Sequence, residues 1–179
     1  MAIESGGDLT ALVRDEERFR AWYEATLPLV YRYLLARCAG DATLAEEITQ
    51  QTFVQAIRHR DRFDGRADVV TWLCAIGRNR LVDHYRRGGR DARRHDRLIE
   101  TQPQADDAPW RAAEARDAVR TAVARLPADQ RLALLFRYLD GMSVREVAAA
   151  LGRSEKATES LLSRARDGFR RAYGGSTDA

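Results

Sequence analysis

The sequence predicts an all-α fold, with two small helical domains joined by a flexible linker and a helix-turn-helix in the second domain. Three observations predict it. Apolar residues recur three and four positions apart along most of the 179 residues, and no strand-like alternation persists. A polar stretch with glycine pairs and prolines interrupts this pattern at residues 88–112. Near the carboxyl end, two short helical patterns flank a single glycine turn.

The first domain is predicted at residues 17–87, after a flexible N-terminal arm at residues 1–16 that is polar and contains glycine. Its first helix starts near Phe19, and Pro28 is expected to kink or restart it. Gly40 and Asp41 end that helix. A second helix is predicted at residues 44–59, and a third at residues 68–87, after a loop at residues 62–66.

The second domain is predicted at residues 113–174, after the linker at residues 88–112, with a flexible tail at residues 175–179. Pro127 suits the start of a helix, and Asp140 with Gly141 closes that helix. Two apolar stripes are expected to form the core of these helices. They consist of Val119, Ala122, Val123 and Leu126, and of Leu132, Leu135, Phe136 and Leu139.

The helix-turn-helix is predicted from cap and turn residues that agree with each other. Ser143 and Glu146 form a capping box, and Gly152 ends the helix that they start. Ser154 caps the next helix, whose buried stripe is Thr158, Leu161, Leu162 and Ala165. This pattern is typical of a DNA reader, and the alternative is a simple helical hairpin. Arg153, in the turn, and Thr158, in the second helix, are more polar than the residues usual at these positions of such a motif.

Charge is sorted along a chain whose formal net charge is only +3. Residues 78–97 hold eight arginines and three aspartates, a local net of 8 − 3 = +5. Residues 41–51 hold three acids and no base. The basic stretch suits a phosphate backbone, and the alternative for both stretches is a solvated helix face.

The cysteine content and the motifs missing from the sequence disfavour secreted proteins, membrane proteins and enzymes. Its two cysteines, Cys38 and Cys74, are expected to be buried or half-buried thiols of a reducing cytoplasm, with a redox pair as the alternative. No apolar run is long enough to insert in a membrane, and no secretion signal begins the chain. No phosphate loop, nucleophile motif or metal spacing is present, so we expect no enzyme, cofactor or metal.

With these parts placed, the chain resembles the extracytoplasmic-function sigma factors of bacterial RNA polymerase. The likeness covers residues 19–87 and 118–173. It rests on the runs AEEITQQTFVQAI, DRFDGRADVVTWL and IGRNRLVDHYRR in the first domain, and on ARLPADQRLALLFRYLDGMSVREVAAALG and LLSRAR in the second. The resemblance implies that the first domain binds core polymerase through the acidic helix. The residues implied there are Asp41, Glu46, Glu47, Gln50, Gln51 and Phe53.

The resemblance further implies that the loop and the third helix bind the promoter −10 element. The residues implied are Arg62, Phe63, Asp64, Arg66, Arg78, Asn79, Arg80, Asp83, Arg86 and Arg87. Asn79 and Asp83 can discriminate base edges, whereas the arginines mostly hold phosphates. The segment at residues 62–68 resembles the family's segment that accepts a flipped base, where Phe63 either stacks on the base or belongs to the core. Trp72 is expected in the core.

The second helix of the helix-turn-helix is implied to read the −35 element in the major groove. The residues implied are Arg153, Ser154, Glu155, Lys156, Glu159, Ser160, Ser163, Arg164 and Arg166. The chain departs from the family at Glu159 and Leu161, where basic residues are common. Glu159 either accepts a hydrogen bond from a cytosine or lies off the groove.

The resemblance also implies an anti-sigma factor as a partner of a chain that is a monomer when free. The competing hypothesis is an autonomous helix-turn-helix regulator. Such a protein usually dimerises on a two-fold site, and no dimerisation heptad is evident here. It would also leave the acidic helix and the −10-like helix without a role. An autonomous regulator would bind DNA tightly alone, whereas a sigma factor needs polymerase.

Overall fold

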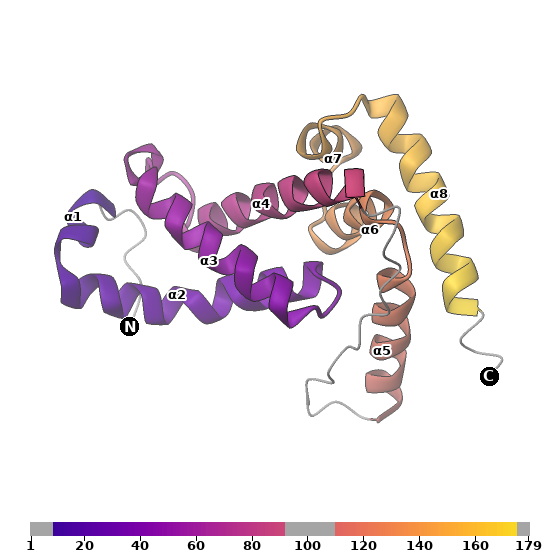
Figure 1. Cartoon of the computed structure of the whole chain (residues 1–179), viewed down its shortest axis with the longest axis horizontal. Coiled ribbons are helices and arrows are strands. Elements are labelled where there is room, and N and C mark those ends of the chain that lie inside the picture. The colour runs from indigo at the N-terminus through magenta and orange to yellow at the C-terminus, as the bar shows by residue number, and fades with distance from the viewer. Residues whose placement is uncertain (1–8, 92–109, 175–179) are drawn as a thin grey trace. The chain divides into compact units, whose positions relative to one another are not determined.

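The structure is a computed structural model that describes residues 9–91 and 110–174, with side chains placed at 9–87 and 116–174. All regular elements in these ranges are helical, as the sequence predicts (Figure 1). The chain divides into two compact units, Met1–Asp83 and His84–Ala179, so the boundary falls inside helix α4. Parts of three predictions lie outside the described residues: positions 1–8 of the arm, 92–109 of the linker with the arginines there, and the tail at 175–179.

The described part of unit 1 begins with a helix where the sequence predicted a flexible arm. Helix α1 (Leu9–Arg14) buries Leu9, which is 6% exposed, and packs against helix α2 (Glu16–Arg37). Asp15 separates the two helices and caps α2, because its carboxylate accepts a hydrogen bond from Arg18 N at 3.1 Å. From residue 9 onward the prediction of an arm is therefore wrong. Six residues were too few for their periodicity to show.

Pro28 lies inside α2, and the helix continues through it to Arg37. The predicted restart of the helix is wrong. Proline removes the hydrogen bond to the carbonyl four residues earlier, which belongs to Glu24. Because Glu24 and Pro28 are both exposed, water can reach this carbonyl, and the helix tolerates the proline.

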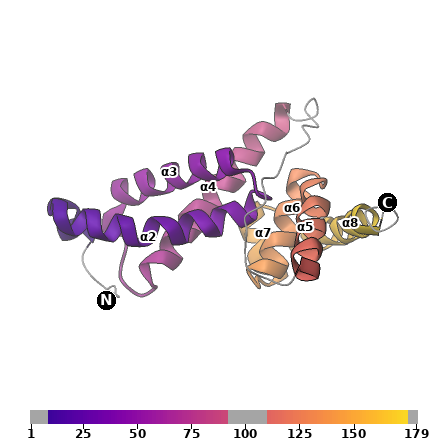
Figure 2. The same ribbon diagram turned by 90° about the horizontal axis from the view of Figure 1, so that it is seen from below.

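The predicted break after α2 is confirmed. Ala39 and Gly40 both take positive φ, +57° and +86°, and this reverses the chain into helix α3 (Ala42–Arg58). Asp41 caps α3, because its carboxylate accepts a hydrogen bond from Leu44 N at 3.0 Å. The left-handed pair therefore sets the antiparallel α2–α3 hairpin, and the two helices lie side by side (Figure 2).

Helix α4 (Val69–Asp91) contributes to the core of unit 1, and its Gly77 lies against Leu34 of α2 and Thr52 of α3. Asp68 starts it by accepting hydrogen bonds from Val70 N and Thr71 N at 2.9 and 3.3 Å. Gly77 allows the close approach, because a Cβ there would meet Leu34 and Thr52 at 3.0 Å. The core holds apolar residues from all three helices: Val30, Leu34, Ile48, Phe53, Leu73 and Leu81.

Unit 2 packs its helices around α8. Helix α5 (Trp110–Ala124) leads to α6 (Ala128–Leu134), a π-helical segment η3 (Leu135–Leu139), α7 (Val144–Leu151) and α8 (Glu155–Gly174). Helix α8 contacts α5, α6 and α7. Helix α4 extends to Asp91 and α5 begins at Trp110. Residues 88–91 and 110–112, at the two ends of the predicted linker, are therefore helical. The core residues of unit 2 are Ala122, Leu132, Phe136, Val147, Leu161 and Leu162.

The π-helical segment overturns part of the predicted core. Leu139, which was placed on a buried stripe, is 54% exposed. Val119, which was also placed on one but lies in α5 and not in this segment, is 41% exposed. In η3 the hydrogen bond from Asp140 N reaches Leu135 O, five residues back, at 3.1 Å. This wider turn rotates the following residues away from the stripe that a 3.6-residue period predicts, so Phe136 stays buried while Leu139 turns outward.

Candidate nucleic-acid and partner interfaces

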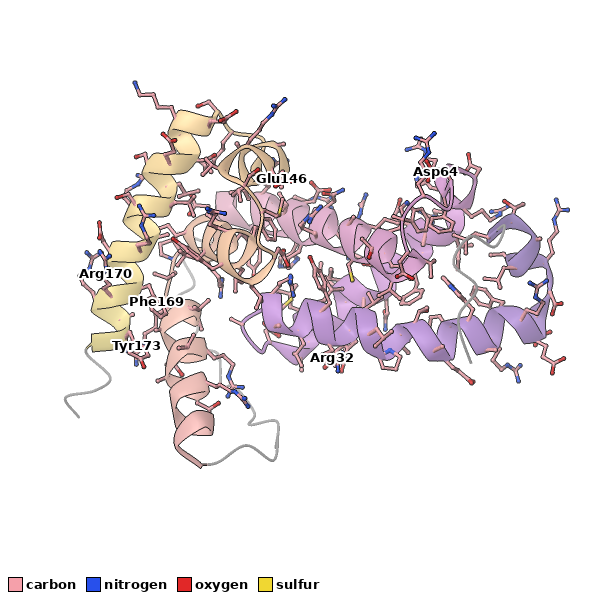
Figure 3. The ribbon with its side chains drawn as sticks, turned by 180° about the vertical axis from the view of Figure 1, so that it is seen from behind. Arg32, Asp64, Glu146, Phe169, Arg170 and Tyr173 are labelled. Atoms are coloured by element: carbon pink, nitrogen blue, oxygen red, sulfur yellow. The ribbon has the colours of Figure 1, made fainter. Side chains whose placement is uncertain are left out.

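The capping box that starts the helix-turn-helix is present. Ser143 Oγ accepts from Glu146 N at 3.2 Å, and Glu146 Oε2 accepts from Ser143 N at 2.7 Å. Glu146 is labelled in Figure 3. Two N–H groups that the first turn of α7 would leave unpaired are thereby satisfied. The predicted start of the motif is confirmed.

A three-residue turn joins α7 to α8. Gly152 is left-handed, at φ +59°, and its N–H donates to Ala149 O at 3.2 Å. Arg153 N donates to Ala148 O at 2.9 Å, which completes a Schellman motif. Ser154 Oγ then accepts from Ala157 N at 3.2 Å and caps α8. Turn and caps therefore fix the direction in which α8 leaves α7.

The buried stripe of α8 is the predicted one, with Thr158, Leu161, Leu162 and Ala165 all buried. Thr158 is fully buried although polar, and its Oγ1 donates to Ser154 O at 3.0 Å. This hydrogen bond satisfies the hydroxyl, so a threonine fits where a more apolar residue is expected. Leu161 is buried at 1%, which places this departure from the family pattern in the core.

The residues predicted to bind −35 DNA lie on the opposite, exposed side of the motif. Glu159 is among them, so it is open to contact. Arg164 Nε donates to Ser160 O at 3.4 Å, and Arg153 forms an ion pair with Asp129 at 3.1 Å. The exposed set is Arg153, Ser154, Glu155, Lys156, Glu159, Ser160, Ser163, Arg164 and Arg166.

Helix α3 exposes the acidic and amide face that the sequence predicts. Glu46, Glu47, Gln50 and Gln51 are exposed, and Gln51 Nε2 donates to Glu47 Oε1 at 2.9 Å. Asp41 is half-buried, and its carboxylate accepts the hydrogen bond from Leu44 N that caps the helix. The polar face is therefore carried by the four residues within the helix.

Phe53 does not belong to that face, and the prediction is corrected here. It is 3% exposed and packs against Trp22 and Tyr23 with ring centroids 5.7 and 4.8 Å apart. Val54, which the sequence reasoning missed, is 45% exposed instead. The helical spacing of the sequence indicates this difference, because steps of four residues from Glu46 through Gln50 lead to Val54 and not to Phe53.

The loop between α3 and α4 presents charge around an aromatic pair. After the 3₁₀ turn η1 (Arg60–Arg62), Phe63 is half-buried with its ring 5.2 Å from that of Trp72, which is also half-buried. Asp64 Oδ1 accepts from Arg66 N at 3.1 Å, across Gly65 at φ +70°. Asp64 is labelled in Figure 3. Trp72 is thus only partly a core residue, and Arg62, Asp64 and Arg66 are exposed.

Helix α4 carries the remaining predicted −10 residues. Asn79 is exposed and Asp83 half-buried, and they share a helix face because they are four residues apart. Arg86 and Arg87 continue that face and are exposed, whereas Arg78 and Arg80 flank it and are half-buried. Leu73, Leu81 and Val82 are buried, so the polar residues are directed away from the core.

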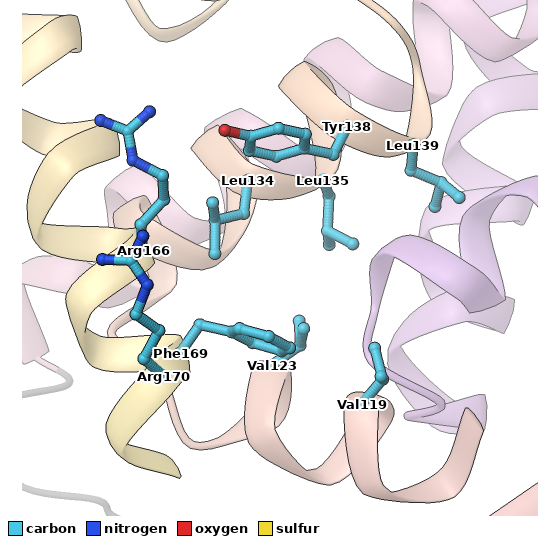
Figure 4. Close-up of a pocket in the computed structure, with 9 residues that line it drawn as sticks. All are labelled: Val119, Val123, Leu134, Leu135, Tyr138, Leu139, Arg166, Phe169 and Arg170. Atoms are coloured by element: carbon cyan, nitrogen blue, oxygen red, sulfur yellow. The ribbon is translucent and has the colours of Figure 1, made fainter. Parts of the chain in front are cut away.

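An apolar groove in unit 2 was not predicted (Figure 4). It is a cavity of about 500 Å³ between α5, the α6–η3 region and α8. The π-helical turn directs Tyr138 and Leu139 into its wall, where they are 62% and 54% exposed. Arg166 and Arg170 lie along the α8 side, so Arg166 borders this groove as well as the predicted DNA face. The lining residues are Val119, Val123, Leu134, Leu135, Tyr138, Leu139, Arg166, Phe169 and Arg170.

Other kinds of site find little support in the described part of the chain. There, no group of three His, Cys, Asp or Glu residues could hold a metal ion. Cys38 is buried and Cys74 half-buried, and neither forms a disulfide. Among the same residues, no helix combines the length and apolar character that crossing a membrane requires.

Comparison with known proteins identifies the family. Residues 22–91 match the Sigma-70 region 2 family and residues 116–167 match Sigma-70 region 4. The chain is 34% identical over 165 residues to the ECF RNA polymerase sigma factor SigC of Mycobacterium tuberculosis, covering 89% of this chain and 85% of SigC. The chain belongs to the extracytoplasmic-function sigma factors. It is also 30% identical to SigM of Bacillus subtilis, covering 84% of this chain and 92% of SigM.

Two solved structures agree with this fold. The RpoE chain of a complex with the anti-sigma factor NepR from Bartonella quintana aligns with TM-score 0.58 at 24% identity, covering 86% of this chain and 95% of RpoE. CnrH, solved with the cytosolic domain of CnrY, aligns with TM-score 0.50 at 26% identity, covering 94% and 95%. As a sigma factor, the chain binds core RNA polymerase and promoter DNA. Region 2 ends with α4 at Asp91, and region 4 spans most of α5 to α8.

Proposed function

We propose that this chain is an alternative sigma factor that docks on core polymerase through α3, engages the −10 element through the η1–α4 loop and α4, and reads the −35 element through α8. The single observation that carries the proposal is the helix-turn-helix, whose capping box and Schellman turn support a polar recognition helix with every residue predicted for the −35 element exposed. The finer domain boundaries remain those expected from the sequence. Because its partner is the polymerase, we place the protein in the cytoplasm.

At the −35 element, α8 would enter the major groove with its amino-terminal half. Glu159 lies on the exposed face and can accept a hydrogen bond from the amino group of a cytosine. Arg164, one turn further along, would hold a phosphate and position the helix. The carboxylate of Glu159 favours a particular base but lowers the general affinity of α8 for phosphates. The −35 element read by this chain should therefore differ from that of relatives with a basic residue at this position.

At the −10 element, the Phe63–Trp72 pair would form one wall of a site for an unstacked base. A half-buried aromatic ring can stack on any base, and the exposed Arg62 and Arg66 beside it suit the neighbouring phosphates. Asn79 and Asp83 would then contact base edges from α4. The unstacking of a base costs a few kcal/mol, which this stacking would offset.

The apolar groove is proposed as the site of an anti-sigma factor. RpoE was solved in complex with the anti-sigma factor NepR, and CnrH was solved in complex with the cytosolic domain of CnrY. Exposed apolar surface gathered into one groove is typical of a protein interface. Arg166 and Arg170 beside it favour an occupant with acidic residues flanking its apolar ones. Because Arg166 also belongs to the predicted DNA face, such an occupant would compete with promoter DNA.

Run-off transcription tests the proposal. Purified core polymerase is assayed on a genomic promoter library with and without this chain, and gel shifts with the chain alone run in parallel. We expect discrete new start sites that share −35 and −10 elements, together with weak DNA binding by the free chain. Tight DNA binding by the chain alone, with no added transcripts, would favour the autonomous regulator.

A further inference from the structure

Arg153 lies in the turn between α7 and α8, and its side chain is directed to α6. Its Nη2 atom lies 3.1 Å from Asp129 Oδ2, across 24 residues of sequence. Both side chains are partly covered, at 40% and 46% exposure. The ion pair therefore connects the turn of the helix-turn-helix to the helix that supports it.

Asp129 is itself held in place. Its other oxygen, Oδ1, accepts from Gln130 N at 2.9 Å in the first turn of α6. A carboxylate is favoured at that end of a helix by the partial positive charge of the free N–H groups. One oxygen is thus anchored to α6, while the other is presented to Arg153.

The turn lacks an apolar contact that turns of this type usually have. In a Schellman motif, the residue after the left-handed glycine commonly makes an apolar contact with the last turn of the helix. Arg153 occupies that position here, and it is polar. Its ion pair with Asp129 takes the place of the missing apolar contact. Ser154, the cap of α8, follows directly, so whatever orders Arg153 also orders the first turn of α8.

We propose that Asp129 is a positioning residue for −35 recognition and that Arg153 acts as a brace and not as a phosphate contact. The inference rests on the proposed role of α8 and revises the DNA-binding role expected of Arg153. It makes a prediction whose sign differs from that of simple electrostatics. Removing the negative charge of Asp129 near DNA should strengthen binding if charge alone matters, whereas loss of the brace weakens it.

The experiment measures binding of a −35 duplex by holoenzyme assembled from core polymerase and the full chain, over a series of KCl concentrations. The variants are Asp129→Asn, Arg153→Gln and the double variant. The matched control is Arg164→Gln, on the exposed face of α8. Circular dichroism melts check that each variant folds. We expect each to fold, because the substitutions leave the backbone of the Schellman turn and the buried stripe of α8 intact.

The brace predicts that each single variant weakens binding roughly twofold to fivefold, the range of exposed ion pairs, and that the double variant is no worse than either. Their salt slopes stay at the wild-type value, whereas Arg164→Gln lowers the slope by about 0.9. Unchanged or tighter binding by Asp129→Asn, or a slope lowered by about one in Arg153→Gln, overturns the inference. If wild-type holoenzyme binds a scrambled −35 duplex equally well, the proposed role of α8 fails instead.

Discussion

The exposed apolar residue on α3 gives the sharpest test of how this sigma factor meets core polymerase. Val54 is 45% exposed beside Gln50 and Gln51, while its neighbour Phe53 is 3% exposed. If a partner covers this face, Val54→Ala should weaken core binding and leave the fold in place. Phe53→Leu should do the reverse, because Phe53 contacts Trp22 and Tyr23 inside the protein.

The expected magnitude follows from the exposed fraction. Truncation to alanine removes two carbons, each worth about 0.8 kcal/mol when fully buried. Since 45% of Val54 remains open to a partner, the loss in binding is about 0.7 kcal/mol, or about threefold in Kd. Within the fold, the lost packing is nearly offset by the better helix propensity of alanine, so the free energy of unfolding should change by less than about 0.5 kcal/mol. Phe53→Leu should lower it by roughly 1 kcal/mol.

The assay is competition of unlabelled variants against fluorescent wild-type chain for core polymerase, with thermal melting of the same samples. The α3 interface predicts that Kd and melting temperature separate between the two variants. A Kd for Val54→Ala equal to that of wild type would refute the role of this apolar residue. A Kd weakened by Phe53→Leu in a fully folded sample would refute the assignment of Phe53 to the core alone.

Three further substitutions test the fold and the promoter surface. Ser143→Ala removes the acceptor of the capping box and should lower the free energy of unfolding by about 1 kcal/mol, seen in thermal melting; an unchanged melting temperature would mean the box is dispensable. Gly77→Ala places a methyl group 3.0 Å from Leu34 and Thr52, so overpacking should cost about 1–3 kcal/mol despite better helix propensity, and a stabilised variant would contradict the close approach of α4. Glu159→Lys should change −35 preference or affinity more than stability, measured by promoter selection with holoenzyme, and unchanged selection and affinity would show that Glu159 does not face DNA.

The sequence predicted the elements whose signals are local and strong. The capping box at Ser143, the glycine turn at Gly152 and the buried stripe of α8 depend on residues within one or two helical turns of each other. The same holds for the break at Gly40, where a left-handed residue and a capping aspartate lie together. Such signals act through backbone hydrogen bonds that the chain forms regardless of its tertiary partners.

Predictions failed where tertiary contacts or irregular backbone decide the outcome. Helix α1 is only six residues long and is fixed by packing Leu9 against its neighbours, which no local pattern reveals. The π-helical turn at residues 135–139 shifts the helical phase, so Leu139 left the predicted core and became a wall of the groove. Arg153 is polar in a turn that usually carries an apolar residue, and its partner Asp129 is 24 residues away in sequence, so no local pattern reveals the contact.

Sorted charge explains how a chain of small net charge can serve two unlike partners. The net charge of +3 would attract neither DNA nor a protein strongly, but the signs are separated onto different helices. Glu46 and Glu47 lie exposed on α3, whereas Arg86 and Arg87 lie exposed on α4. With the proposed roles of α3 and α4, each surface would attract one partner and repel the other, which would orient the chain during encounter more than it would add affinity. Salt screens both surfaces, since exposed charges interact only weakly beyond about 10 Å at 0.1 M ionic strength. Specific contacts such as those proposed for Val54 and Glu159 must then hold the complex once it has formed.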